Sequence, residues 1–200
     1  LTLPVSGPVC LALSRDGRLA VTGSEEPESL RLWRLPAGTS SRPWKAQRAQ
    51  PEALGQGSAS ALALSGDGRF VLAGDAHGWL RLLDVEEGWC RSAWQAHSQA
   101  IRSVRLSSDG RVAFSSSLDG AIGCWEVVSG RRWETLPGPY EAMSVSPEGR
   151  FLLTAGGDRV LRLWELDWEL NAQKETAPLA DTWKKSTVLE MIGGLFRRKT

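Results

Sequence analysis

The side chains with the clearest chemical potential in this 200-residue chain are a serine, a histidine and an aspartate in its second half. Ser115, His97 and Asp119 are the residue types of a hydrolase triad, in which histidine activates serine and aspartate orients histidine. A catalytic serine also needs an oxyanion hole, and no GxSxG-like turn surrounds Ser115. The sequence therefore predicts no catalytic residues and no enzymatic activity.

Two histidines and three cysteines could in principle bind a metal ion: His77, His97, Cys10, Cys90 and Cys124. Their spacings match no zinc pattern, and Cys10 and Cys124 lie in apolar runs where a buried thiol is inert. Three widely separated cysteines also give no disulfide framework. No phosphate-binding GxxxxGK[ST] or GxGxxG loop occurs. We expect no metal site, no cofactor and no small-molecule substrate.

The charge balance disfavours nucleic-acid and membrane binding. Lys and Arg number 24 against 23 Asp and Glu, for a net charge of +1, so no strong field attracts polyanions. No apolar run reaches the length of a membrane span. Arg31, Arg81 and Arg162 recur at one position of an internal repeat, and we expect them to extend along its rim with their charges in water.

An internal repeat sets the elements that must position these side chains. The pattern Ser-x-Asp/Glu-Gly-Arg begins at residues 14, 65, 107 and 146, and its glycines are 51, 42 and 39 residues apart. A second motif ends 15 or 16 residues after each glycine and reads LRLW, LRLL, IGCW and LRLW. Alternating apolar runs flank each Asp-Gly or Glu-Gly pair, which is a hairpin signal. With tryptophan-bearing segments as last strands, the pattern predicts four strands per repeat. Ten tryptophans and 21 glycines agree with such an all-β fold.

These motifs resemble those of the WD-repeat family over residues 1–168. In that family a loop histidine, a second-strand serine or threonine, a turn aspartate and a third-strand tryptophan form a hydrogen-bonded network. The resemblance assigns this structural role to His97, Ser115, Asp119 and Trp125 in the third repeat, and to Thr154, Asp158 and Trp164 in the fourth. The first repeat keeps Thr22 and Trp33. The second has Ala73, His77 and Leu83 at these positions, so we expect no network there.

The resemblance implies an all-β fold of β-propeller blades, in four four-stranded antiparallel repeats. We expect the blades at about residues 5–47, 58–95, 98–136 and 139–175. Propellers have four to eight blades, and the family most often about seven, so we expect part of a larger ring. Leu1–Pro4 resembles the segment before the fourth blade, which suggests that the chain begins inside an earlier blade.

The last residues, 176–200, depart from the repeat. Val188, Leu189, Ile192, Leu195 and Phe196 have helical spacing, and Thr187 with Glu190 matches a capping box. The tail is also rich in Lys and Arg. We expect a short basic amphipathic helix, which either lies against the propeller or recruits a membrane or nucleic acid.

The function implied by the family is that of a protein–protein interaction scaffold, which presents propeller loops to a protein or peptide partner. Trp79 follows a turn on the face that such proteins often use, and tryptophan is enriched in interface hot spots. Other candidate partner-binding residues on the same loops are His77, Gln99, Arg102, Tyr140 and Arg159. The alternative is a structural segment of a larger multidomain protein with no ligand of its own. We expect an intracellular location, in the cytoplasm or nucleus.

Overall fold

The computed structural model describes residues 10–24, 30–35, 39–43, 58–138, 140–147, 149–165, 187–192 and 195–199, and every regular element in these residues is a strand. The first sheet contains β1 (Cys10–Leu13), β2 (Leu19–Gly23), β3 (Arg31–Arg34) and β4 (Thr39–Pro43). The second contains β5 (Ala61–Leu64), β6 (Phe70–Gly74), β7 (Trp79–Asp84) and β8 (Cys90–Gln95).

The third sheet contains β9 (Ile101–Leu106), β10 (Val112–Ser117), β11 (Ala121–Glu126) and β12 (Arg132–Pro137). The fourth contains β13 (Tyr140–Val145), β14 (Phe151–Gly156), β15 (Leu161–Glu165), β16 (Thr187–Ile192) and β17 (Leu195–Lys199). All strand pairs are antiparallel, which confirms the predicted all-β class with four antiparallel sheets. In the described residues no helix has the length and hydropathy needed to cross a membrane.

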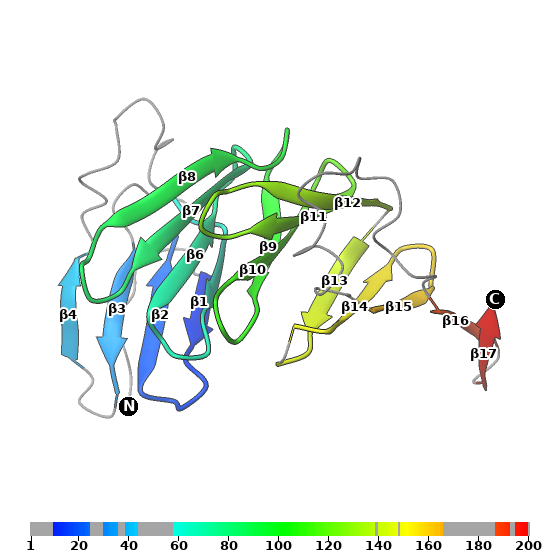
Figure 1. Cartoon of the computed structure of the whole chain (residues 1–200), viewed down its shortest axis with the longest axis horizontal. Coiled ribbons are helices and arrows are strands. Elements are labelled where there is room, and N and C mark those ends of the chain that lie inside the picture. Colours follow the sequence, from blue (N-terminus) through cyan, green and yellow to red (C-terminus); the bar gives the residue numbers. More distant parts are fainter. Residues whose placement is uncertain are drawn as a thin grey trace, which may run out of the picture.

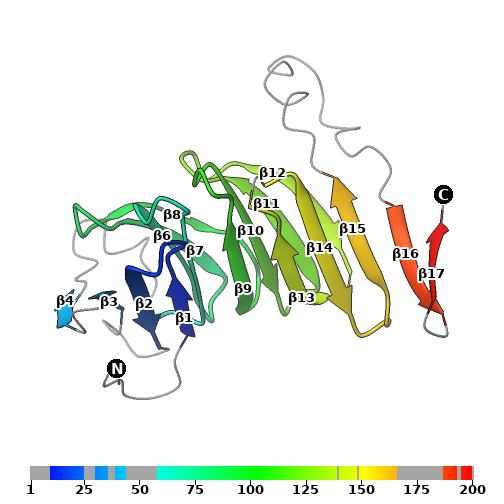
Figure 2. The ribbon, with the colours of Figure 1, turned by 90° about the horizontal axis from the view of Figure 1, so that it is seen from below.

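The four sheets form an open arc (Figure 1). Within each sheet the strand order follows the chain. The first strands of successive sheets lie next to each other, with β1 against β5, β5 against β9 and β9 against β13. No comparable contact joins β1 to β13 in the described part of the chain, so the first and fourth sheets do not close a ring. Figure 2 shows the third and fourth sheets stacked along this arc.

The first hairpin of each sheet turns through the Ser-x-Asp/Glu-Gly-Arg motif. In the first sheet, the Ser14 hydroxyl donates to Asp16, whose carboxylate also accepts the backbone N–H of Arg18. These two bonds lower the pKa of Asp16. The Leu19 N–H donates in turn to Ser14 Oγ, and the same three bonds recur at Ser65 and Ser107. The motif is thus a self-bonded turn.

The apolar core lies between neighbouring sheets. Along β6 and β7, alternate side chains face the first and the third sheet: Val71 and Leu83 belong to one cluster, and Leu72, Leu80 and Leu82 to the next. A further cluster joins the third sheet to the fourth. Each fully buried leucine contributes about 1.5–3 kcal/mol relative to exposure, so each sheet is stabilised mainly by its neighbours.

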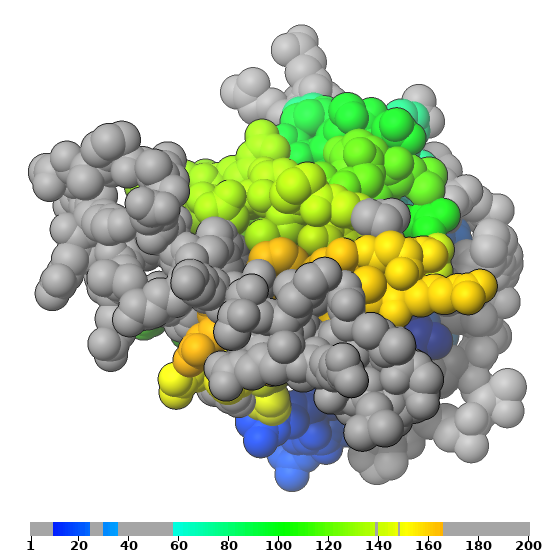
Figure 3. Space-filling model, turned by 90° about the vertical axis from the view of Figure 1, so that its right-hand side faces the viewer, coloured from blue at the N-terminus to red at the C-terminus, as the bar shows by residue number. Residues whose placement is uncertain are grey.

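Apolar side chains also lie on the outer faces of the two end sheets. In β1, Leu11 is 70 % and Leu13 58 % exposed, while the alternate residues Cys10 and Ala12 pack against the cluster shared with the second sheet. In β14, Leu153 is exposed while Leu152 faces the third sheet. Figure 3 views the molecule from the side of the fourth sheet, coloured yellow to orange. The two ends of the arc therefore carry leucines of the kind that are buried between the inner sheets.

At the end of the chain, the described residues 187–192 and 195–199 form the hairpin β16–β17, and β16 pairs with β15 in the last sheet. The predicted end of the fourth blade near residue 175 lies outside the described residues, and the helical tail over 176–200 stays a prediction. The sequence contains Gly193-Gly194 between the two strands, and glycine disfavours a continuous helix. β-branched Thr187, Val188 and Ile192 favour a strand.

Candidate functional site

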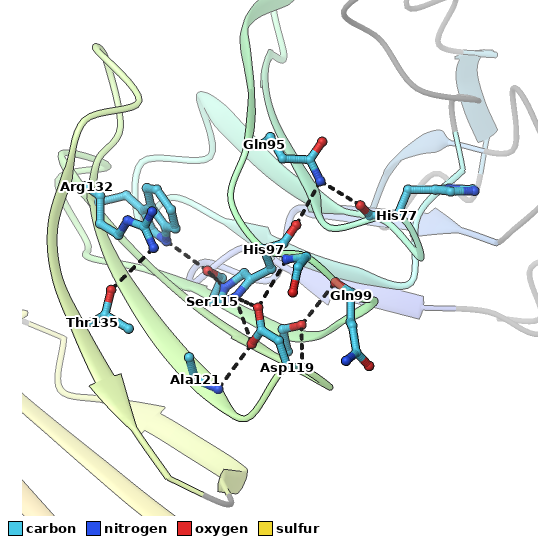
Figure 4. A network of polar contacts seen from close by, with 12 residues as sticks. His77, Gln95, His97, Gln99, Ser115, Asp119, Ala121, Arg132 and Thr135 are labelled. Atoms are coloured by element: carbon cyan, nitrogen blue, oxygen red, sulfur yellow. Dashed lines mark hydrogen bonds and ion pairs between the residues drawn. The ribbon is translucent and has the colours of Figure 1, made fainter.

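The structure brings His97, Ser115 and Asp119 together at the third sheet (Figure 4), and Trp125 bonds to the same serine. His97 Nδ1 lies 2.9 Å from Asp119 Oδ2, and His97 Nε2 lies 2.8 Å from Ser115 Oγ. The indole N–H of Trp125 donates to the same oxygen at 2.8 Å. Asp119 also accepts the backbone N–H groups of Ser98 and Ala121. The network thus joins the loop before β9 to strands β10 and β11.

The direction of each bond follows from what the groups can donate. A carboxylate only accepts, so His97 Nδ1 carries the proton that faces Asp119. In the neutral ring Nε2 is then an acceptor, and the Ser115 hydroxyl donates to it. The remaining capacity of Ser115 Oγ is as an acceptor, which the Trp125 N–H uses. With this arrangement of protons, each of the three side-chain hydrogen bonds has one donor and one acceptor.

This arrangement has the residue order of a hydrolase triad but not the access that one needs. Ser115 is fully buried, and the indole N–H of Trp125 already bonds its oxygen. The ring of Trp125 packs edge-on against His97, with 6.1 Å between centroids. A nucleophile must reach the substrate carbonyl within an oxyanion hole. The burial of Ser115 supports a structural bond between strands.

The first and fourth sheets contain shorter versions of this network. In the first, the Trp33 indole donates to Thr22 Oγ1 at 2.9 Å, and in the fourth the Trp164 indole donates to Thr154 Oγ1 at 3.0 Å. Asp158 forms an ion pair with Arg162, whose side chain is 23 % exposed. The bond from the tryptophan indole to the threonine hydroxyl is thus retained in sheets whose preceding loop has no histidine.

The second sheet contains a buried ion pair in place of the network. Arg81 is 1 % exposed, so the expectation that it extends into water is wrong. Its Nη2 lies 2.7 Å from Asp75 Oδ2, and its Nη1 donates to the carbonyl of Ser58. The other Asp75 oxygen accepts the N–H groups of His77 and Trp79. Asp75 is therefore both the counterion of Arg81 and the acceptor that fixes the β6–β7 turn.

The space for this arginine is explained by the third sheet. The Trp125 indole covers Gly123, and a side chain on Gly123 would meet its ring atoms at 2.5 Å. Arg81 stands at the corresponding position of β7, two residues before Leu83 instead of a tryptophan. Because Leu83 carries no indole, the guanidinium of Arg81 can be buried there. The sequence could have predicted this ion pair. Ala73 and Leu83 replace the residues of the network, and Asp75 places a carboxylate close to Arg81.

The β6–β7 turn and the loop before β9 are held against each other at one end of the sheets. The carbonyl of Gly78 accepts the N–H groups of Ala96 and His97, at 2.9 and 3.0 Å. Gln95 Nε2 donates to the carbonyls of His77 and His97 (Figure 4). Gly78 has φ +84°, and a Cβ there would lie 2.2 Å from the His97 carbonyl oxygen. Only glycine fits this contact. We call the surface formed by residues 75–79 and 95–99 the loop platform.

The predicted partner-binding residues are distributed unevenly with respect to the loop platform. His77 and Gln99 are exposed on it, and Trp79 is half-buried at the start of β7. Arg102 is exposed on β9, and exposed Arg159 lies in the β14–β15 turn of the fourth sheet. Tyr140 differs from the prediction, because it is buried between the third and fourth sheets and its hydroxyl donates to the Pro137 carbonyl.

The titratable groups of the described residues do not form a metal site. No group of three His, Cys, Asp or Glu side chains in the described ranges could hold a metal ion. The three cysteines are free thiols. Burial raises the pKa of Cys10, Cys90 and Cys124, which keeps them protonated and poorly nucleophilic.

A protein-family model matches two of the repeats described above. The family model described as "WD domain, G-beta repeat" matches residues 88–126 and 133–165. These ranges cover most of the third and fourth sheets and include the network of His97, Ser115, Asp119 and Trp125.

Several curated proteins are similar to the chain. Eukaryotic translation initiation factor 3 subunit I of Drosophila willistoni is 34 % identical over 77 residues, 37 % of this chain and 24 % of that protein. WD repeat-containing protein SL1-17 of Schistosoma mansoni is 22 % identical over 163 residues, 80 % of this chain and 51 % of that protein. WD repeat-containing protein 91 of Xenopus tropicalis is 31 % identical over 65 residues, 32 % of this chain and 9 % of that protein. The chain thus spans about half of the length of one of these relatives and a quarter or less of the other two.

Replacing Ser115 by alanine is expected to lower the free energy of unfolding by roughly 2–4 kcal/mol, because it leaves both His97 Nε2 and the Trp125 indole buried without their partner. Urea unfolding followed by tryptophan fluorescence measures the loss. Thr154→Val removes one bond at a half-buried tryptophan and should cost less. A Ser115→Ala variant as stable as the wild type would contradict the structural role.

Replacing Asp75 by asparagine is expected to cost roughly 3–5 kcal/mol of unfolding free energy, because it leaves the Arg81 charge buried while the turn keeps its acceptor. Adding Arg81→Met should recover part of this loss. The matched control is Asp158→Asn, whose ion pair with Arg162 is partly exposed and should matter much less. Equal losses in the two single variants would argue against a special role for burial.

Proposed function

Because the chain belongs to the WD-repeat family, we propose that it is an interaction scaffold whose loop platform binds a partner protein or peptide. The observation that carries this proposal is the fixed geometry of the platform. Proteins of this family generally act as scaffolds without catalytic activity. One similar protein is a subunit of a translation initiation factor, which is by name a component of an assembly.

The loop platform is suited to binding because its backbone is ordered before a partner arrives. Gly78, Gln95 and His97 link the turn to the loop, and Asp119 fixes the following residue, Ser98. A preorganised surface loses less conformational entropy on binding. The exposed side chains of His77 and Gln99, with half-buried Trp79, then provide polar groups beside an aromatic anchor.

The outer face of the first sheet supports a second candidate function, that of a segment of a larger propeller. Leu62 and Leu64 of β5 contact the first sheet, which precedes theirs in the chain. Leu11 and Leu13 stand at the corresponding positions of β1, and both are exposed. We therefore propose that another propeller blade covers them, as the first sheet covers Leu62 and Leu64.

The thiols support an intracellular setting for either function. Cys10, Cys90 and Cys124 are free, and their raised pKa values make them poor nucleophiles. Free thiols are typical of reducing compartments, whereas secreted proteins commonly use cysteines in disulfides.

The platform is tested by replacing Trp79 with alanine. Partners captured on the immobilised chain from a cell extract are identified, produced pure and titrated against each variant by calorimetry. Trp79→Ala should weaken a platform partner at least about tenfold, because hot-spot aromatic residues carry most of the binding energy. Arg111→Ala, an exposed change at the opposite end of the sheets, is the control. Full affinity for Trp79→Ala would contradict binding at the platform.

The outer face of the first sheet is tested by light scattering on a sizing column. The isolated chain should self-associate as its concentration rises, since exposed leucines on a sheet face favour association. The double variant Leu11→Ser and Leu13→Ser should shift the chain toward the monomer without loss of folded signal. Leu62→Ser is the contrasting variant and should destabilise the fold, because its site is covered. Identical association of wild type and double variant would remove this face from consideration.

A further inference from the structure

A groove opens between the second and third sheets, at the end opposite the loop platform. Its volume is about 400 Å³, and it is lined by Phe70, Leu82, Trp89, Arg91, Ser92, Gly110, Val127 and Val128. The strands of the second sheet alternate in direction, so the 66–69 and 85–89 turns lie together at this end. The turn at 75–78 lies at the other end. The groove is thus separate from the site proposed above.

Both walls of the groove depart from the repeat at exposed positions. The β7–β8 and β11–β12 turns have the same backbone bonds: the N–H of Gly88 donates to Asp84, and that of Gly130 to Glu126. In this alignment Trp89 corresponds to Arg131, and Val128 corresponds to Glu86. Val128 is 79 % and Trp89 36 % exposed. At each of these two positions, the other turn has a charged residue and the same backbone bonds. Neither turn therefore needs its apolar side chain for folding.

The aromatic wall is held in place by charged groups. The Trp89 indole donates to Glu87 Oε2 at 3.0 Å. The Arg91 guanidinium lies over both Phe70 and Trp89, 5.5 and 5.9 Å from the ring centroids. Such cation–π contacts fix the faces of the rings. The aromatic surface is therefore ordered before anything binds to it.

The polar groups of the groove define the chemistry of its occupant. Arg91 is the one charged side chain among its lining residues. It shares the buried carboxylate of Asp84 with Arg69, with Nε–Oδ2 distances of 3.1 and 3.9 Å, so two guanidinium groups face one carboxylate. Ser92 Oγ is buried in the lining without a hydrogen-bond partner among the described residues. A carboxylate at the rim of the groove would accept hydrogen bonds from the exposed Arg91 guanidinium, and the Ser92 hydroxyl offers a further donor.

We propose that this groove is a second docking site, which binds a short extended peptide with an apolar side chain close to an Asp or Glu. The apolar side chain enters between Trp89 and Val128, and the carboxylate binds Arg91. A peptide is favoured over a small molecule because β8 borders the groove and pairs only with β7 in the described residues. Its free edge offers backbone groups to an extended chain. Tryptophan and arginine at the rim are the residues enriched in such hot spots.

The groove is tested with a phage-displayed library of random heptapeptides, selected on the immobilised full chain. Enriched peptides are synthesised with a fluorescein label and titrated by fluorescence anisotropy. We expect them to contain Leu, Ile, Phe or Met close to an Asp or Glu. Replacing that acidic residue by its amide should weaken binding severalfold, because it removes the charge that faces Arg91.

The variants come from the repeat itself. Val128→Glu and Trp89→Arg introduce the residues that the sister turns already carry, so both should fold, as circular dichroism melts will show. Each should weaken the selected peptides by about tenfold or more, while Trp79→Ala should not change their affinity. Binding that survives Val128→Glu, or a selection that returns the same peptides from wild type and Val128→Glu, overturns the proposal. Peptides that depend on Trp79 alone would overturn it as well, while supporting the loop platform.

Discussion

Each inner sheet of this chain has apolar side chains on both faces, and these leave water only where a neighbouring sheet lies against them. Val71 and Leu83 face the first sheet while Leu72 and Leu80 face the third. A strand cannot offer one face without the other, because its side chains alternate. Every sheet therefore needs a neighbour on each side. The inner sheets meet this requirement by packing in an arc, whereas the first sheet has its outer leucines, Leu11 and Leu13, exposed.

The loop platform depends on the same packing between sheets. Trp125 lies in the cluster between the second and third sheets and contacts Trp94, with 6.1 Å between ring centroids. Its indole reaches Ser115, which in turn fixes His97 and the loop that bears it. The carbonyl of Gly78, on the second sheet, accepts the N–H of His97. The geometry of the exposed loops thus depends on a buried tryptophan, through hydrogen bonds that link Ser115, His97 and Gly78.

The repeat pattern predicted the strands and the tryptophan partners because both are local in sequence. The Ser-x-Asp-Gly turns bond within six residues, and Trp33 and Trp164 meet threonines across one strand pair. Arg81 was misjudged because the local signal of Asp75 and Leu83 was not used, and because its second partner, the carbonyl of Ser58, lies in the distant segment before β5. Tyr140 was misjudged for the same reason, since a neighbouring sheet covers it. In the last segment the sequence alone did not decide, because apolar spacing over a few residues fits helix and strand alike.

Departures from the repeat divide into two kinds with different meanings. At Arg81 the loss of the tryptophan is matched by Leu83, Ala73 and Asp75, and the pair is buried. That change is explained by stability within the sheet. At Val128 and Trp89 the departure puts apolar surface into water, where the sister turns carry Glu86 and Arg131 without harm to the same backbone bonds. Folding does not require these two residues, and both line the groove that we propose as a peptide-docking site.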